Sequence, residues 1–255
     1  MAGTSDDTIL VDVEGRVALV TLNRPETLNA VTHAMHERLA VLWRELENND
    51  EVGAIVVTGA GRGFCSGADL KAPTPDFDRV IEMMEFGRRR TRELLDLSKP
   101  VISAINGPAV GLGCALALTA DISIAAEDAI LNDGHIGVGV AAGDHAVLVW
   151  PERLGMARTK YLLFTGRGLT GREAAEAGLV SLAVPKEDVL DTAMETAREV
   201  LAQVGSAVRW TKVALNHRLR ADLAAHELST AYEMLGMLGK EAHRARDYFR
   251  ELHDA

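Results

Sequence analysis

The chain has 255 residues, of which 47% are hydrophobic and 25% are charged, and its formal net charge is −10. The apolar content suffices for a large core, in one domain or in one domain with an appendage. The negative charge argues against a general nucleic-acid binder. The only two cysteines, Cys65 and Cys114, belong to no Cys-x-x-Cys pair, so neither a disulfide framework nor a zinc site is supported.

The N-terminal residues and the longest apolar run both argue against a membrane protein. The N-terminal residues 1–7 are polar and acidic and lack the basic and apolar regions of a signal peptide. The longest uncharged apolar run, residues 104–120, is short for a membrane span and is interrupted by Asn106, Gly107 and Pro108. We therefore expect a cytoplasmic protein that does not act at a membrane.

The first half of the chain repeats strands, glycine-rich turns and helices. Residues 9–14 and 16–22 alternate weakly around Glu14-Gly15, which predicts a hairpin. Apolar spacing then predicts helices over 32–48, 78–97 and 112–119, and strands over 53–58, 101–105 and 122–126. This alternation favours a mixed α/β core.

From residue 156 onward the pattern is mainly helical. The expected helices span 157–164, 171–177, 186–204, 206–219 and 222–250. A helical tail after an α/β core commonly packs on that core or on a neighbouring subunit. We therefore expect a core domain over residues 1–200 and a helical oligomerisation region over residues 201–255.

The segment Gly59–Lys71 follows a predicted buried strand and contains glycines at 59, 61, 63 and 67. A strand, a flexible turn and a possible helix start direct backbone N–H groups toward one place, which suits a phosphate or an oxyanion. The segment lacks Gly-x-x-x-x-Gly-Lys-Ser/Thr and does not fit Gly-x-Gly-x-x-Gly at a helix start. A purely structural loop is the alternative, because glycine-rich turns are common.

Several motifs occur in one order along the chain: Asn23-Arg-Pro-Glu-Thr-Leu-Asn-Ala30, Gly63-Phe-Cys-Ser-Gly-Ala-Asp-Leu-Lys71, the run from Lys99 to Gly113, Ala120-Asp-Ile, Leu162-Leu-Phe-Thr-Gly166 and Ala174-x-x-x-Gly-Leu-Val180. Together they resemble the enoyl-CoA hydratase/isomerase (crotonase) superfamily over about residues 9–250. The resemblance implies a spiral of ββα units with a helical C-terminal region, assembled as a homotrimer or a dimer of trimers.

The resemblance also implies a CoA thioester as substrate, with no separate cofactor and no metal. The backbone N–H groups of Ala68 and Leu112 would hold the charge that develops on the thioester oxygen. Leu112 stands where the family normally has glycine, so its side chain would narrow or reshape the pocket. By the same resemblance the acyl-CoA contacts are Ala68, Asp69, Leu70 and Lys71, with Arg24, Leu28 and Ala30 near the nucleotide end.

The proton-handling part departs from this family pattern. Hydratases of the family carry two glutamates, and the matching positions hold Ala115 and His135. The pattern of His135, Gly143-Asp144 and Trp150-Pro151 instead resembles 6-oxocamphor hydrolase, a relative that cleaves a carbon–carbon bond between two carbonyls. That resemblance makes His135 the base that activates water and Asp144 the residue that orients it.

Further candidates and alternatives remain at this site. Glu233 matches a substrate-contacting glutamate of the oxocamphor enzyme, and Asp133 and His145 are second-tier candidates. His135 could be a hydrogen-bonded histidine without a chemical part, and Asp144 could cap the helix that begins in the apolar run 146–149. Cys65 and Cys114, beside the oxyanion motifs, are expected to be packing residues.

Three hypotheses therefore stay open. The first is an enzyme of acyl-CoA metabolism, nominally an enoyl-CoA hydratase or isomerase, with His135 as the acid/base group. The second is a hydrolase of a β-diketone or β-keto thioester that uses a His135–Asp144 pair. The third is an oligomer that binds acyl-CoA without turnover, since both usual glutamates are absent.

Overall fold

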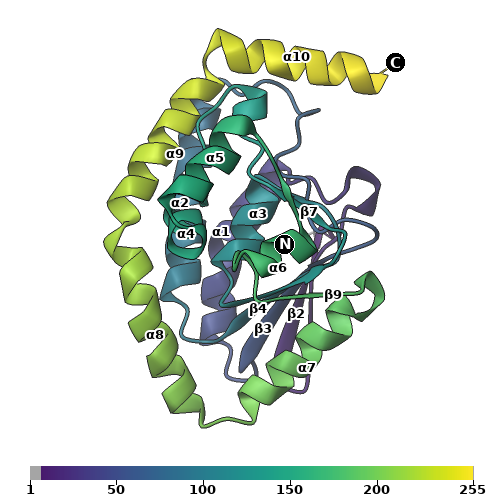
Figure 1. The fold of residues 1–255 in the computed structure, drawn as a ribbon, viewed down its shortest axis with the longest axis vertical. Coiled ribbons are helices and arrows are strands. Elements are labelled where there is room, and N and C mark those ends of the chain that lie inside the picture. The colour runs from purple at the N-terminus through teal and green to yellow at the C-terminus, as the bar shows by residue number, and fades with distance from the viewer. Residues whose placement is uncertain (1–6, 255) are drawn as a thin grey trace, which may run out of the picture.

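The computed structural model describes residues 7–254, apart from the side chains of residues 249, 250 and 252–254. Within these residues the main sheet has six strands in the order β1-β2-β3-β4-β6-β9 (Figure 1). Their bounds are Ile9–Glu14, Val17–Leu22, Ala54–Gly59, Val101–Ile105, Ile122–Ala126 and Leu182–Val184. β1 and β2 form the predicted antiparallel hairpin, and all other neighbours in this sheet are parallel.

Helices surround this sheet, as expected for a largely parallel sheet that is buried on both faces. Their bounds are α1 His33–Asn48, α2 Phe77–Asp96, α3 Leu112–Thr119, α4 Ala146–Leu154, α5 Met156–Thr165, α6 Gly171–Glu176, α7 Val189–Leu201, α8 Gly205–Ala221, α9 Leu223–Met237 and α10 Lys240–Asp254. α7 packs on β2, β3, β4 and β6, whereas α2 packs against α1, α8 and α9. The long α8 and α9 run along one edge of the molecule, and α10 crosses its end (Figure 1).

Four elements have the predicted bounds: β1, β4, α3 and β6. Every residue of β4 is buried, whereas most of β1 is exposed. The predicted helix over 222–250 is wrong as one element, because the chain breaks between α9 and α10 at Leu238 and Gly239. The short strands β8 (Leu169–Thr170) and β9 were not predicted, since two or three residues carry no readable period.

A second, three-stranded sheet of the described residues joins β5 (Ala109–Val110), β7 (Ile130–Asn132) and β8. This sheet places the loop after β7 beside the start of α3. The contact between them is a hydrogen bond in which Gly111 N donates to the Asn132 carbonyl at 3.0 Å. The chain is thus a mixed α/β protein with a helical C-terminal region. The division at residue 200 falls within the last turn of α7 and stays a prediction.

No helix among residues 7–254 is long and apolar enough to cross a membrane. Residues 1–6, which carry most of the argument against a signal peptide, lie outside the described residues.

Candidate active site

The glycine-rich loop after β3 is held in place by Asn29. This buried side chain donates from Nδ2 toward the carbonyl oxygens of Ala60, Gly63 and Phe64 at 3.0, 2.9 and 3.2 Å. Arg24 supports the end of the same loop by donating to the Ala30 carbonyl at 2.6 Å and to Asp69 Oδ2 at 3.1 Å. The 23–30 motif therefore has a structural part in this molecule, because it fixes the loop that carries Ala68.

Hydrogen bonds on one side of the loop direct the Ala68 N–H to the other side. Val31 N donates to the Gly67 carbonyl at 2.8 Å, and Asp69 N donates to the Val31 carbonyl at 3.1 Å. In such a parallel bridge the residue between these two, Ala68, turns its own N–H away from Val31. Among residues 7–254 no group accepts from this N–H.

The second predicted donor, Leu112, is the first residue of α3 and has the unpaired N–H of a helix N-terminus. The start of α3 packs directly on the glycine-rich loop, since Val110 N donates to the Cys65 carbonyl at 2.9 Å. A Cβ at Gly113 would overlap that carbonyl, so glycine is required for this close approach. Ala68 and Leu112 line the same cavity, as the sequence predicted.

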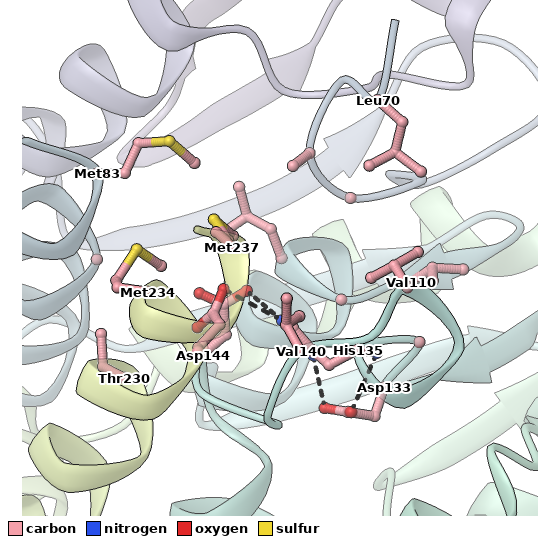
Figure 2. A pocket seen from close by; sticks show the side chains of 18 of the residues that line it. Leu70, Met83, Val110, Asp133, His135, Val140, Asp144, Thr230, Met234 and Met237 are labelled. Atoms are coloured by element: carbon pink, nitrogen blue, oxygen red, sulfur yellow. Dashed lines mark hydrogen bonds and ion pairs between the residues drawn. The ribbon is translucent and has the colours of Figure 1, made fainter. Parts of the chain in front are cut away.

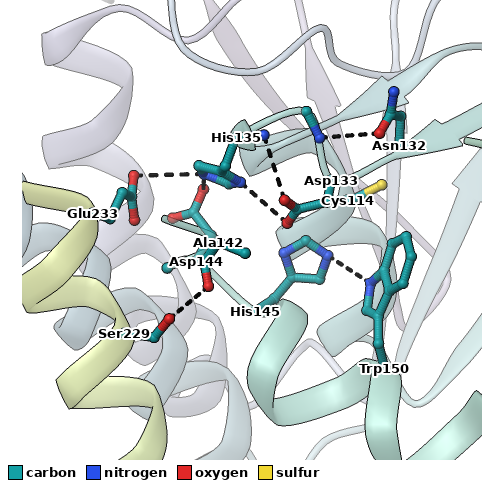
Figure 3. A network of polar contacts seen from close by, with 12 residues as sticks. Cys114, Asn132, Asp133, His135, Ala142, Asp144, His145, Trp150, Ser229 and Glu233 are labelled. Carbon is teal, nitrogen blue, oxygen red and sulfur yellow. Dashed lines mark hydrogen bonds and ion pairs between the residues drawn. The ribbon is translucent and has the colours of Figure 1, made fainter. Parts of the chain in front are cut away.

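His135 lies in the loop after β7, surrounded by three carboxylates from separate segments (Figure 3). Its Nδ1 is 3.1 Å from Asp133 Oδ1. Its Nε2 is 3.5 Å from Asp144 Oδ2 and 3.5 Å from Glu233 Oε1. The carboxylate that fixes the ring through Nδ1 is therefore Asp133, a second-tier candidate, whereas Asp144 faces Nε2.

Asp144 is anchored by a cation that the sequence analysis left unassigned. Arg90 on α2 is 1% exposed and donates from Nη2 to Asp144 Oδ1 at 2.8 Å. Three consecutive arginines, Arg88-Arg89-Arg90, would by themselves indicate a solvated face of the helix, but Arg90 is buried. Its spacing from Val80, Met83, Gly87 and Leu94 places it on the buried stripe of the helix, and that period was the available signal.

Asp144 does not cap a helix, which corrects the alternative considered for it. The residue before α4 is His145, and its side chain makes no capping hydrogen bond. His145 is fully buried and accepts from Trp150 Nε1 at 3.0 Å, so it has a packing part outside the cavity. The loop 142–144 is instead held by α9, where Ser229, Thr230 and His226 contact the carbonyl oxygens of Ala142, Gly143 and Asp144.

The ionisation of this cluster follows from burial and from its charges. Burial alone would lower the pKa of His135, but the Glu233 charge and the contacts with the neighbouring aspartates outweigh it and raise the pKa well above 6.5. Burial and then the Asp144 charge raise the pKa of Glu233 to about 7. Burial opposes ionisation of Asp144, yet Arg90 and His135 hold its pKa well below the usual range.

These groups border a cavity of about 120 Å³ whose remaining wall is largely apolar (Figure 2). The apolar side chains include Leu70, Met83, Val140, Met234 and Met237. Of the predicted residues, His135, Asp144, Ala68, Leu112, Leu70 and Glu233 line this cavity. Asp69 borders an adjoining hollow, whereas Arg24, Leu28, Ala30 and Lys71 do not line the cavity, so their contact with substrate stays a prediction.

His135, Asp144 and Glu233 are also the group of described side chains whose ligand atoms lie close enough, within 4.8 Å, to hold a metal ion. Arg90 already supplies a positive charge to Asp144, and the raised pKa of His135 keeps a proton on the ring. Both features favour a proton over a metal ion at this place. Cys65 and Cys114 are buried free thiols, and burial raises the pKa of Cys65 to about 12, so they are packing residues.

Comparison with known proteins agrees with this geometry. The family described as enoyl-CoA hydratase/isomerase matches residues 12–254. The short-chain-enoyl-CoA hydratase of Clostridium acetobutylicum is 34% identical over 84% of this chain and 83% of its own. The 1,2-epoxyphenylacetyl-CoA isomerase of Escherichia coli is 37% identical over 82% and 81%.

Solved structures lead to the same family. The crystal structure of an enoyl-CoA hydratase/isomerase from Mycobacterium paratuberculosis superimposes with a TM-score of 0.90 at 34% identity, covering 94% of this chain and 98% of that one. The chain therefore belongs to the enoyl-CoA hydratase/isomerase (crotonase) superfamily.

Proposed function

We propose that the protein acts on an acyl-CoA thioester, with an oxyanion hole formed by the N–H groups of Ala68 and Leu112 and proton transfer by His135 and Glu233. The observation that carries this proposal is that the backbone N–H donors and the ionisable side chains lie at one cavity. Two unpaired backbone donors and a carboxylate–histidine cluster line the same small, largely apolar space.

The backbone donors suit the charge that such reactions develop. When a proton or a nucleophile adds to an enoyl thioester, or leaves it, negative charge builds on the thioester oxygen. Fixed N–H groups in a water-poor cavity stabilise that charge without reorganisation, and one such donor is commonly worth about 10²–10³ in rate. Neither Ala68 nor Leu112 needs a particular side chain for this task.

The two ionisable groups divide the proton transfer between them. His135 rests as an imidazolium because of its raised pKa, and Glu233 titrates near neutrality. In hydration, the Glu233 carboxylate takes a proton from water while the water oxygen bonds to C3, and His135 donates its proton to C2. The contact between Nε2 and Glu233 Oε1 then returns the proton to His135. In isomerisation the same pair moves one proton between two carbons.

This arrangement replaces the two glutamates of the usual hydratase site. Ala115 is buried in α3 and does not line the cavity, so nothing at that position can transfer a proton. Glu233 enters from α9, on the other side of His135. No cofactor beyond the CoA of the substrate enters these steps.

A C–C bond hydrolase of a β-diketone or β-keto thioester is the second candidate. One observation favours it: the three residues singled out by the oxocamphor resemblance, His135, Asp144 and Glu233, meet at one ring nitrogen. Water would bond to one carbonyl carbon, the bond to the central carbon would break, and the resulting enolate would be held by the same N–H groups before it takes a proton.

A panel of enoyl-CoA, epoxyacyl-CoA, β-ketoacyl-CoA and β-diketone substrates tests these proposals with the full chain. We expect His135→Asn and Glu233→Gln each to lower kcat on the true substrate by about 10²–10⁴-fold. The exposed His217→Asn and Glu195→Gln are matched controls that leave kcat unchanged. Unaltered turnover in both cluster variants would refute the assignment, and no turnover of any substrate would favour a binding protein.

We also propose a homotrimer or dimer of trimers. Support comes from the C-terminal helices, where large apolar side chains are exposed on α8 and α9: Trp210, Leu215, Leu228, Tyr232 and Leu235. Such a surface is typical of a subunit interface. Light scattering tests it, and a monomer at micromolar concentration would contradict it.

A further inference from the structure

His36 on α1 is a buried polar side chain without a polar partner. It is 9% exposed and lines the active-site cavity. Among the described residues neither its Nδ1 nor its Nε2 makes a hydrogen bond. The other histidines near the cavity differ, because His135, His145 and His226 each contact a polar group through at least one ring nitrogen.

Burying the His36 ring without hydrogen-bond partners lowers the stability of the folded protein unless a ligand supplies a partner. Burial, and then the nearby Arg90 charge, lower the pKa of His36 to about 4, so the ring is neutral near pH 7. A neutral imidazole offers one N–H donor and one acceptor nitrogen. A phenyl ring would fill similar space without leaving either group unpaired.

His36 lies on a different element from the proposed backbone donors. Its wall of the cavity includes Met83 and Gly87 from α2 and Met237 from α9, and it continues into the adjoining hollow, which Ala68 also lines. A thioester oxygen held by the N–H groups of Ala68 and Leu112 already has two donors. His36 is therefore left to another polar group of the ligand.

We propose that His36 binds a neutral oxygen function, a hydroxyl or a keto group, on the acyl chain of the substrate, apart from the thioester carbonyl. This inference rests on the proposed function, because it assumes an acyl-CoA in the cavity. A carboxylate is not favoured there, because the nearby Arg90 guanidinium is already paired with Asp144 and the neutral imidazole adds no charge of its own. A hydroxyl can donate to the acceptor nitrogen of the ring or accept from its N–H, whereas a keto oxygen can only accept from the N–H.

The test measures dissociation constants of the full chain by titration calorimetry. The probes are saturated acyl-CoAs paired with counterparts that carry a hydroxyl or keto oxygen at C4 or further along the chain, where neither hydration nor cleavage consumes them. At one chain position the protein should bind the oxygenated ligand about tenfold or more tighter than its deoxy partner. The hydroxyl and keto series show which oxygen is preferred.

Variants assign this preference to the ring. In His36→Phe the oxygenated-to-deoxy ratio should fall to within about twofold, while Tm stays at or above that of the parent protein because an unpaired polar group is removed. His36→Leu serves if the phenyl ring does not fit. His36→Gln, which keeps a donor and an acceptor, should restore part of the ratio, and the exposed His217→Phe should preserve it.

The outcomes separate this inference from the proposed function. If deoxy acyl-CoA binds and no oxygenated partner binds more tightly, or if the preference survives in His36→Phe and His36→Leu, the assignment of His36 fails alone. If no acyl-CoA of either kind binds, the proposed function fails and this inference fails with it.

Discussion

Glu233→Gln tests whether burial destabilises the negative charge of the Glu233 carboxylate. The Glu233 carboxyl is buried, and its Oε2 has no hydrogen-bond partner among residues 7–254. Its pKa rises from 4.5 to about 7 on folding. The folded state therefore binds this proton more tightly than the unfolded state. The stabilisation is fully present below pH 4.5 and is lost as the pH rises through about 7.

The size of the effect follows from the shift. A change from 4.5 to about 7 corresponds to about 3 kcal/mol of unfolding free energy between acidic and alkaline conditions. Glutamine keeps the shape of the protonated carboxyl and does not ionise. We expect the parent protein and the variant to be similarly stable at pH 5, and the variant to be more stable by about 3 kcal/mol at pH 8.5.

Urea unfolding at fixed protein concentration between pH 5 and 8.5 measures the difference. Asp133 and Asp144 have lowered pKa values and stay ionised through this window, so they do not contribute to its slope. His135 does contribute, because the Glu233 charge raises its pKa and the substitution removes that charge, so the difference between the two curves belongs to the His135–Glu233 pair. The exposed Glu195→Gln is the control and should follow the parent protein. Parallel curves for the parent protein and Glu233→Gln would refute the buried, destabilised carboxylate and the role of Glu233 as the group that titrates in the active range.

Two further substitutions test how the cluster is held. Arg90→Met removes the cation on Asp144 and leaves a buried carboxylate uncompensated, so the free energy of unfolding in urea should fall by about 3–5 kcal/mol. The exposed Arg89→Met should change it by no more than about 0.5 kcal/mol. Equal effects of the two substitutions would contradict the buried Arg90–Asp144 pair. Gly143→Ala places a Cβ 2.6 Å from that of Glu233, which must displace α9, so kcat should fall by about tenfold or more and an unchanged kcat would contradict the packing.

The sequence could indicate the backbone constraints around the proposed oxyanion hole, because such constraints leave a readable trace in glycine positions. Glycines at 67, 111 and 113 mark places where a side chain would collide or where φ is positive, at +96° for Gly67 and +51° for Gly111. Such constraints act between neighbours in the chain or across one strand pair. The motif order then assigned Ala68 and Leu112 as N–H donors; this assignment stays a prediction, and the structure places both residues at one cavity.

The proton-transfer half was only partly predictable because its contacts cross long sequence distances. Arg90 and Asp144 are 54 residues apart, and no local pattern distinguishes a buried arginine from its solvated neighbours except the helical period. Both Asp133 and Asp144 lie near His135 in sequence, so the sequence could not decide which carboxylate meets which ring nitrogen. That depends on how α9 holds the loop 142–144.

The two halves of the proposed site depend on different parts of the chain. The proposed oxyanion donors are backbone groups whose positions follow from the packing of α3 on the glycine-rich loop. The proton-transfer groups are side chains from α2, α9 and two loops, and a single substitution can exchange their chemistry without disturbing the sheet. Relatives named hydratase and isomerase are 34% and 37% identical to this chain over 219 and 215 residues. In this chain a histidine lies among three carboxylates, and Arg90 balances one of them. In the proposed function, the ionisation of His135 and that of Glu233 set the charge of the cavity, as acid–base catalysis near neutral pH requires.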